Sequence, residues 1–229
     1  MKLVIFDCDG TLIDSQHNIT AAMAHAFTSH ALKPPPAHRV LSVVGLSLTE
    51  AFAVLVPDQT PELRRSLADH YRSAHAEGRL QRLDEPLYPG VRNAIATLVE
   101  QGDVLLGIAT GKSRRGVARL LEREGWHQTF LTIQTADDHP SKPHPSMIMA
   151  ALAEAGVRVD AAVMVGDTSF DMTMARNAAV GALGVAWGYH RPDLLWAAGA
   201  HRVIETGDGL VEAIGQQLAE QAAAATEFP

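Results

Sequence analysis

Two aspartates separated by one residue, Asp7 and Asp9, follow the apolar run at the start of the chain in "KLVIFDCDGTLIDS". In an extended strand, residues i and i+2 point to the same side, so we expect the two carboxylates to converge just past the end of the strand. Two negative charges that close repel each other, and a bound cation or a shared proton is the usual compensation. The pair therefore predicts a metal site or an acid–base site at this strand end.

Further polar residues follow other apolar runs, at the points where predicted strands end. Because the carboxyl ends of parallel strands lie at one edge of a sheet, where ligands bind, we expect these groups to meet in one cleft. They are Thr110, Gly111 and Lys112 in "IATGK", Lys142 in "SKPHP", and Asp167 and Asp171 in "GDTSFD".

The residue types at this edge indicate a metal and an anion. The four aspartates offer hard carboxylate oxygens, which suit Mg²⁺ better than zinc, so the candidate metal ligands are Asp7, Asp9, Asp167 and Asp171. The Thr110 hydroxyl, the Gly111 N–H group and the Lys142 ammonium group suit a bound anion. A carboxylate-bound Mg²⁺ beside an anion pocket is the equipment for phosphoryl transfer, where positioning and charge neutralisation provide most of the catalysis.

A carboxylate can also be the nucleophile in such a reaction, and this gives the paired aspartates different tasks. Asp7, at the end of the strand, would attack phosphorus and form an acyl phosphate. Asp9 would protonate the leaving oxygen and later deprotonate the water that hydrolyses the intermediate.

These residues must be positioned by a parallel sheet. Short apolar runs bounded by turn residues alternate with longer segments of helical period, a pattern typical of an α/β fold with a Rossmann-like parallel sheet flanked by helices. The nearly continuous hydrophobicity of the runs favours strands covered on both faces. The predicted strands are 2–7, 104–110, 130–135, 161–167, 182–187 and 202–204.

The segment between the first two predicted strands is too long for a single crossover connection, and it carries helical signals of its own. Ser47 with Glu50 three residues later predicts a capping box, and Pro61 suits the first turn of a helix. The predicted helices are 17–32, 47–56 and 60–78, with "KPPPAH" (33–38) as an internal loop and "LDEPLYPGV" (83–91) as the return linker.

These boundaries predict two domains. Residues 15–85 would form an inserted helical cap domain, and residues 1–14 and 86–229 would form the α/β core domain.

The composition, 47% hydrophobic and 20% charged, is that of a soluble globular protein. A net charge of −7 without any basic block gives no indication of a nucleic-acid-binding surface, and no apolar stretch approaches the length of a membrane span. Cys8 is the only cysteine, which favours a cytoplasmic location and a role as a small buried hydrophobe rather than a redox sensor. We expect a monomer or homodimer acting on a small phosphorylated metabolite.

With its motifs in this order, the sequence resembles the haloacid dehalogenase-like superfamily of phosphatases over essentially the whole chain. The motifs are "DCDGT" (7–11), Thr110 in "IATGK", Lys142 in "SKPHP" and "GDTSFD" (166–171). The helical insertion after the first motif resembles the cap of the phosphoglycolate phosphatase-like branch.

The resemblance implies the same nucleophile and acid/base as the residue types do, and it implies that Thr110 and Lys142 hold the transferring phosphoryl group. It also implies that Asp7, the backbone carbonyl of Asp9 and Asp167 bind Mg²⁺, with Asp171 orienting the metal shell.

The cap loop "VVGLSL" (43–48) resembles the element that closes over the substrate, so Gly45 is a candidate substrate-binding residue. The loop carries little charge, and Arg39 is the nearest cationic residue in sequence. A strongly anionic leaving group such as glycolate favours a nearby positive charge, so the resemblance indicates a phosphatase more firmly than it indicates phosphoglycolate as the substrate.

Each motif alone also has a structural explanation. The first and last motifs can be turns beside strands and helices, Thr110 with Gly111 can cap the next helix, and Lys142 can be a solvated loop residue. All four motifs at one sheet edge favour the catalytic interpretation.

Several alternatives of function remain open from the sequence. A dehalogenase of the same superfamily needs neither Asp9 nor "GDTSFD", and both are present. A β-phosphoglucomutase-type phosphomutase keeps the four motifs but uses cations of the cap to hold a second phosphate, which the uncharged loop after Gly45 disfavours. A pyrophosphatase of the same superfamily is a further alternative. A catalytically silent binding module is the non-enzyme alternative, against which the complete set of charged motif residues argues.

Overall fold

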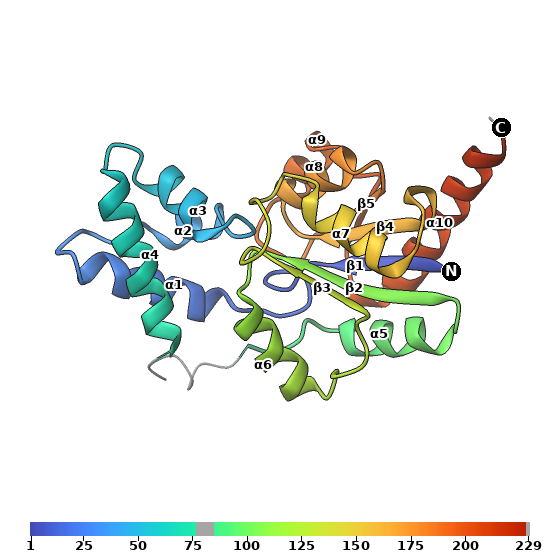
Figure 1. Ribbon diagram of the computed structural model, residues 1–229, viewed down its shortest axis with the longest axis horizontal. Helices are drawn as coiled ribbons and strands as arrows, with labels where there is room; N and C mark the ends of the chain where they lie inside the picture. Colours follow the sequence, from blue (N-terminus) through green and yellow to red (C-terminus); the bar gives the residue numbers. More distant parts are fainter. Residues whose placement is uncertain (77–84, 228–229) are drawn as a thin grey trace.

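The computed structural model describes residues 1–76 and 85–227, which form two lobes (Figure 1). The sheet lobe contains a six-stranded parallel sheet in the order β3-β2-β1-β4-β5-β6, with helices on both of its faces. This confirms the α/β parallel-sheet prediction. The strands are β1 (Lys2–Phe6), β2 (Val104–Thr110), β3 (Thr132–Thr135), β4 (Ala162–Gly166), β5 (Gly181–Val185) and β6 (Arg202–Ile204).

All six predicted strands are present. β2 and β6 have the predicted bounds. β1 and β3 differ from their predictions by one or two residues at one end, and β4 and β5 differ by one or two residues at each end. The prediction for β3 starts too early because Phe130 turns its ring against Trp126, with 5.8 Å between the ring centroids, before pairing with β2 begins at Thr132.

Both faces of the sheet are buried, as the continuous apolar runs predict. Val4 and Phe6 of β1 pack with α5, α6 and α10, and the intervening Leu3 and Ile5 pack with α7, α8 and α9. None of the helices in the described ranges is long and apolar enough to cross a membrane. The helices of this lobe are α5 (Val91–Glu100), α6 (Arg114–Glu124), α7 (Ser146–Ala155), α8 (Ser169–Asn177), α9 (Pro192–Ala197) and α10 (Leu210–Glu227), with short 3₁₀ turns at Val159–Ala161 and Gly207–Gly209.

The helical lobe lies beyond the carboxyl ends of the central strands (Figure 1). It has its own apolar core, in which the rings of Phe27 and Phe52 lie 6.2 Å apart. Its helices are α1 (Gln16–Thr28), α2 (Ala37–Leu41), α3 (Leu48–Leu55) and α4 (Pro61–Ala76).

The loop prediction for 33–38 is wrong at its end, because α2 already begins at Ala37. Pro36 is the N-cap of α2 and has an extended backbone (ψ 151°), so the helix starts directly after the last proline. The buried side chain of Val40 packs the short helix against the core of the lobe. Ser47 caps α3, since its hydroxyl accepts a hydrogen bond of 3.4 Å from the N–H of Glu50. The predicted capping box is only half formed, because the N–H of Ser47 donates to the Ser141 hydroxyl at 2.8 Å instead of to Glu50.

Parts of three predictions lie outside the described residues: the end of the helix at 60–78, the start of the linker at 83–91, and the corresponding part of the cap domain at 15–85. The division into two domains stays a prediction.

The two segments that join the lobes are hydrogen-bonded to each other. The N–H of Asp14 donates to the carbonyl of Pro86 at 2.9 Å, and the N–H of Tyr88 donates to the carbonyl of Leu12 at 3.0 Å, around an antiparallel bridge between Ile13 and Leu87. The chain therefore leaves the sheet lobe and returns to it through one paired junction.

Replacing Phe52 by alanine tests the packing of the helical core. Phe52 is fully buried, so Phe52→Ala should lower the free energy of unfolding of the helical lobe by about 3–5 kcal/mol. Urea denaturation followed by circular dichroism measures the change. Val54→Ala on the same helix is the control, because Val54 is 51% exposed and should change stability by less than about 0.5 kcal/mol. Equal effects of the two substitutions would contradict the packing described here.

Candidate active site

A cluster of buried carboxylates lies at the carboxyl edge of the sheet. Asp7 follows β1, Asp167 follows the adjacent β4, and Asp171 lies in the first turn of α8. One oxygen from each of the three lies within 4.8 Å of the other two, and none of these residues is more than 1% exposed. The sheet order thus brings together residues that are far apart in the sequence.

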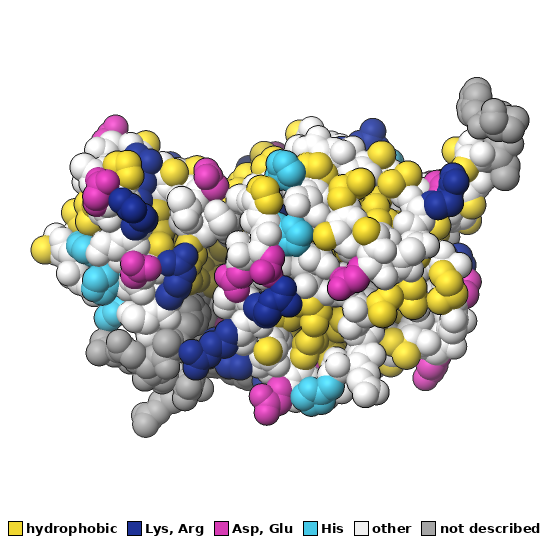
Figure 2. Space-filling view, in the orientation of Figure 1, with side chains coloured by type: hydrophobic (Ala, Val, Ile, Leu, Met, Phe, Trp, Pro, Cys, Tyr) yellow, Lys and Arg dark blue, Asp and Glu magenta, His cyan; other side chains and the backbone are white. Residues whose placement is uncertain are grey.

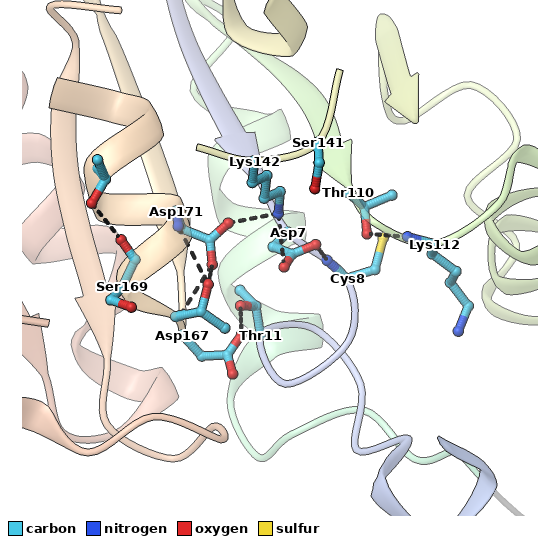
Figure 3. Close-up of polar contacts among 12 residues, drawn as sticks. Asp7, Cys8, Thr11, Thr110, Lys112, Ser141, Lys142, Asp167, Ser169 and Asp171 are labelled. Carbon is cyan, nitrogen blue, oxygen red and sulfur yellow. Dashed lines mark hydrogen bonds and ion pairs between the residues drawn. The ribbon is translucent and has the colours of Figure 1, made fainter. Parts of the chain in front are cut away.

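Lys142 enters the cluster from the loop between β3 and α7 and is itself only 1% exposed. Its Nζ lies 2.9 Å from Asp7 Oδ2 and 2.6 Å from Asp171 Oδ1 (Figure 3). Burial alone lowers the pKa of Lys142, but the negative charges of Asp171 and Asp7 outweigh burial and raise the pKa above its ordinary value. The ammonium group is therefore charged and links the two carboxylates.

Asp171 is held in place by hydrogen bonds at the N-terminus of α8. Its Oδ2 accepts hydrogen bonds from the N–H and the hydroxyl of Thr168, at 3.0 and 2.6 Å, while the Thr168 hydroxyl caps the N–H of Asp171. This capping box leaves Oδ1 directed at Lys142. The helix-cap explanation of "GDTSFD" is correct for Thr168 and Asp171, and the same carboxylate also belongs to the cluster.

Asp167 is oriented by two other segments. Its Oδ1 accepts from the Thr11 hydroxyl at 2.9 Å, and its Oδ2 accepts from the N–H of Tyr189 at 2.8 Å. Gly10 makes this approach possible, because it has φ +87° and a Cβ atom there would lie 2.2 Å from Asp167 Oδ2. The turn after Asp7 therefore has a steric reason for its glycine.

Burial disfavours the negative charge of the clustered carboxylates. It raises the pKa of the Asp7 carboxyl to about 6, although the Lys142 ammonium acts in the opposite direction. Burial and then the charge of Asp171 raise the pKa of Asp167 well above its usual range. One ammonium group does not neutralise three carboxylates. A divalent cation would offset the remaining charge.

A second observation, besides the excess negative charge, indicates that these carboxylates fit Mg²⁺ as ligands. Asp7 Oδ2 is buried and has no hydrogen bond of acceptable geometry, although it lies within ion-pair distance of Lys142. Carboxylate oxygens with unused lone pairs in a site of this kind are the ligands that Mg²⁺ prefers.

The carboxylate of Asp9 is not one of the three that cluster. β1 ends at Phe6, and Asp7 and Asp9 both line the cavity at this edge, so the convergence of the two carboxylates stays a prediction. Asp9 Oδ1 accepts from the ammonium of Lys112 at 2.7 Å and from the hydroxyl of Ser15 at 2.6 Å. The attraction of this carboxylate and of Glu85 outweighs burial and raises the pKa of Lys112.

Thr110 and Gly111 lie where the predictions put them, at the end of β2 beside β1. Thr110 is 1% exposed and its hydroxyl accepts from the N–H of Lys112 at 3.2 Å. The cap of the next helix is Ser113, so capping is not the task of Thr110. Figure 3 shows the Thr110 hydroxyl near Asp7 and the Lys112 side chain running away from the carboxylate cluster.

The loop of the helical lobe around Gly45 contacts the sheet lobe. A Cβ atom on Gly111 would lie 2.9 Å from the carbonyl oxygen of Gly45, and the N–H of Ser47 donates to the Ser141 hydroxyl at 2.8 Å. Gly45 itself has φ +97° and lies against Thr168. The candidate substrate-binding residue therefore lies over the site, as the resemblance implies.

A cavity of about 660 Å³ lies between this loop and the sheet edge. Asp7, Asp9, Thr110, Gly111 and Gly45 all line it. Lys142, Asp167 and Asp171 are not among its lining residues, but each has a charged atom within 4.8 Å of a carboxylate oxygen of Asp7, which is one of them.

Several contacts of the site were not found by sequence reasoning. The side chains of Ser15 and Lys112 bind Asp9, the hydroxyl of Tyr189 lies 3.1 Å from that of Ser15, and Ser141 binds the Gly45 loop. The sequence places Lys112 at the sheet edge as part of "IATGK" but does not indicate its ion pair with Asp9, and Ser141 belongs to the motif "SKPHP".

The chain is similar to known enzymes over nearly its whole length. Residues 4–185 match the family model described as haloacid dehalogenase-like hydrolase. The probable phosphatase IndB of Dickeya dadantii is 34% identical over 92% of this chain and 92% of the relative. The pyrophosphatase PpaX of Bacillus pumilus is 32% identical over 85% of this chain and 91% of the relative.

A further relative and a solved structure agree with these similarities. The phosphoglycolate phosphatase of Agrobacterium fabrum is 32% identical over 82% of this chain and 81% of the relative. The crystal structure of a hydrolase from Pseudomonas syringae superposes with a TM-score of 0.82 at 26% identity, covering 94% of this chain and 99% of that one.

Cys8 should not react with thiol reagents in the folded protein. Its side chain is fully buried, as predicted, and burial raises the pKa of the thiol, with the charge of Asp7 adding to the effect. We expect no modification by 5,5′-dithiobis(2-nitrobenzoate) under native conditions and one thiol per chain in guanidinium chloride. Rapid native modification would show that the turn after β1 opens.

Proposed function

The chain belongs to the haloacid dehalogenase-like hydrolase family and is a phosphatase of that family, and we propose that it releases phosphate from a phosphomonoester in an Mg²⁺-dependent reaction through a phosphorylated Asp7. The observation that carries the proposal is the buried Lys142, which binds Asp7 and Asp171 next to a cavity lined by Asp7 and Thr110. This arrangement suits the stabilisation of a transferring phosphoryl group.

In the first step a carboxylate oxygen of Asp7 attacks phosphorus, and the bond between phosphorus and the leaving oxygen breaks. Asp9 gives its proton to that oxygen, so the leaving group departs as an alcohol. In the second step Asp9 takes a proton from water, the water oxygen attacks phosphorus, and the bond to Asp7 breaks. Phosphate is released and both aspartates return to their starting states.

Asp7, Asp167 and the backbone carbonyl of Asp9 would hold Mg²⁺, and Asp171 would orient them through Lys142 and Thr168. Bound there, the cation would supply positive charge next to the phosphoryl oxygens. Thr110, the N–H of Gly111 and Lys142 would bind the remaining phosphoryl oxygens.

Asp9 lines the same cavity as Asp7, so its carboxyl group is able to face the leaving oxygen. Lys112 and Ser15 hold it in the present conformation, in which the ion pair with Lys112 keeps it a carboxylate. Before it acts as the acid, Asp9 must leave this ion pair and take up a proton from solvent, which it then gives to the leaving oxygen.

We further propose that the chain is built as the phosphoglycolate phosphatase-like branch is, with residues 15–85 as the cap domain and residues 1–14 and 86–229 as the core domain. The contacts of the Gly45 loop with Gly111 and Ser141 support closure of the cap over the site. The substrate would be a small phosphorylated metabolite, with the enzyme in the cytoplasm.

Hydrolysis of pyrophosphate is the second candidate. One observation favours it: the PpaX relative of Bacillus pumilus is named a pyrophosphatase. Pyrophosphate therefore belongs among the substrates tested.

Asp7→Asn should abolish turnover, because an amide cannot form the acyl phosphate. Phosphate release is measured from phosphomonoesters and pyrophosphate, with Mg²⁺ and with chelator, and we expect a rate that needs Mg²⁺ and falls by at least about 10³-fold in the variant. Asp103→Asn is the control, since Asp103 pairs with Lys2 at the surface and should leave the rate unchanged. Near-normal turnover by Asp7→Asn would refute the nucleophile assignment.

Asp9→Asn should discriminate between leaving groups. A poor leaving group needs a proton, so turnover of alkyl phosphates should fall by about 10²–10⁴-fold, whereas formation of the phosphorylated enzyme from p-nitrophenyl phosphate should fall much less. Acid quenching should then trap the phosphorylated enzyme, because its hydrolysis also needs Asp9. An equal loss for both esters in the first step would exclude Asp9 as the acid.

A further inference from the structure

The cavity beside the phosphoryl site is large and two-sided. Its volume of about 660 Å³ is that of a pocket for a drug-sized ligand, which typically measures roughly 300–1,000 Å³. Glycolate and pyrophosphate would fill only a small part of it. The space beyond the phosphoryl group therefore suits a larger leaving group.

The wall that faces this space from the helical lobe is mainly apolar. It is contributed by α1, α3, α4 and the loop around Gly45, and Figure 2 shows hydrophobic side chains in the hollow between the lobes. We call six of its hydrophobic side chains the apolar wall: Ile19, Met23, Val43, Val44, Leu46 and Tyr71. Polar residues of the same lobe also line the cavity: Ser47, Thr49, Glu50 and Arg72.

Few cationic side chains of the cavity are available to bind a second anionic group of the substrate. Lys112 is paired with Asp9, and Arg72 with Asp69. Arg115 and Arg119 line the cavity from α6, but both are exposed, so water screens their charge.

Acidic and basic side chains are also balanced there. Among the described lining residues, the acids are Asp7, Asp9, Glu50 and Asp137, and the bases are Arg72, Lys112, Arg115 and Arg119. A small anionic leaving group would find no surplus of positive charge.

Resting on the proposed function, we propose that the substrate is a phosphomonoester with a bulky, mainly apolar leaving group that packs on the apolar wall. The phosphoryl group lies at Asp7 and Thr110, and the leaving group extends toward Val44 and Leu46. Burial of its surface against these side chains supplies the discrimination between substrates. Glycolate and pyrophosphate cannot use this wall.

The test compares esters whose leaving alcohols have similar pKa values: ethyl, hexyl and 2-cyclohexylethyl phosphate, together with 2-phosphoglycolate and pyrophosphate, all with Mg²⁺. We expect kcat/KM for the hexyl and cyclohexylethyl esters to exceed that for each of the other three compounds by at least about tenfold. Equal or faster turnover of 2-phosphoglycolate or pyrophosphate overturns the inference while the phosphatase activity stands. No Mg²⁺-dependent phosphate release from any compound overturns the proposed function, and the inference with it.

A matched pair of variants locates the effect. Val44 lines the cavity, whereas Val54 lies on α3 of the same lobe with 51% of its surface exposed and does not line it. Val44→Asn should lower kcat/KM for hexyl phosphate by about tenfold and change that for ethyl phosphate by less than about twofold. Val54→Asn should change neither. An equal loss on both esters in Val44→Asn contradicts the assignment of the wall, and thermal melting of both variants checks that they fold.

Discussion

A fully buried ammonium group between carboxylates is the interaction on which the site depends. Lys142 is the cation that links Asp7 to Asp171, and removing one partner of such a buried group leaves an uncompensated charge, at a cost of about 3–5 kcal/mol. The lysine does not neutralise the cluster, so an affinity for a further cation follows from the same arrangement that orients the nucleophile. Stability and chemistry are therefore coupled at this point of the fold.

The order of the strands explains how the cluster forms. β1 lies between β2 and β4, so the residues that follow these three strands meet although the chain visits them at widely separated positions. α8 then begins directly after β4, and its capping box turns one oxygen of Asp171 toward the lysine. Backbone geometry of an ordinary kind, a parallel sheet and a capped helix, is sufficient to position the charged groups.

Much of the fold and the location of the candidate site could be predicted from the sequence, because continuous apolar runs mark buried parallel strands and polar residues end them. Thr110, Lys142, Asp167 and Asp171 lie at one edge for this reason. The partners of the Asp9 carboxylate could not be predicted in this way. The alternation of side chains along a strand gives the side on which a residue lies, but it does not give a contact such as that with Lys112, 103 residues away. The start of α2 depends in a similar way on the burial of Val40 by other helices.

The paired junction between the lobes has a consequence for how this architecture changes. Ile13 and Leu87 form an antiparallel bridge. The helical lobe is therefore an insertion whose two ends are held next to each other at the sheet lobe. The entropy of closing a loop grows slowly with its length, by about 0.6 kcal/mol for each doubling. We therefore expect a change in the length of the segment between these residues to cost the sheet little closure entropy. The two contacts that such a change must preserve are those of Ser15 with Asp9 and of the Gly45 loop with Gly111.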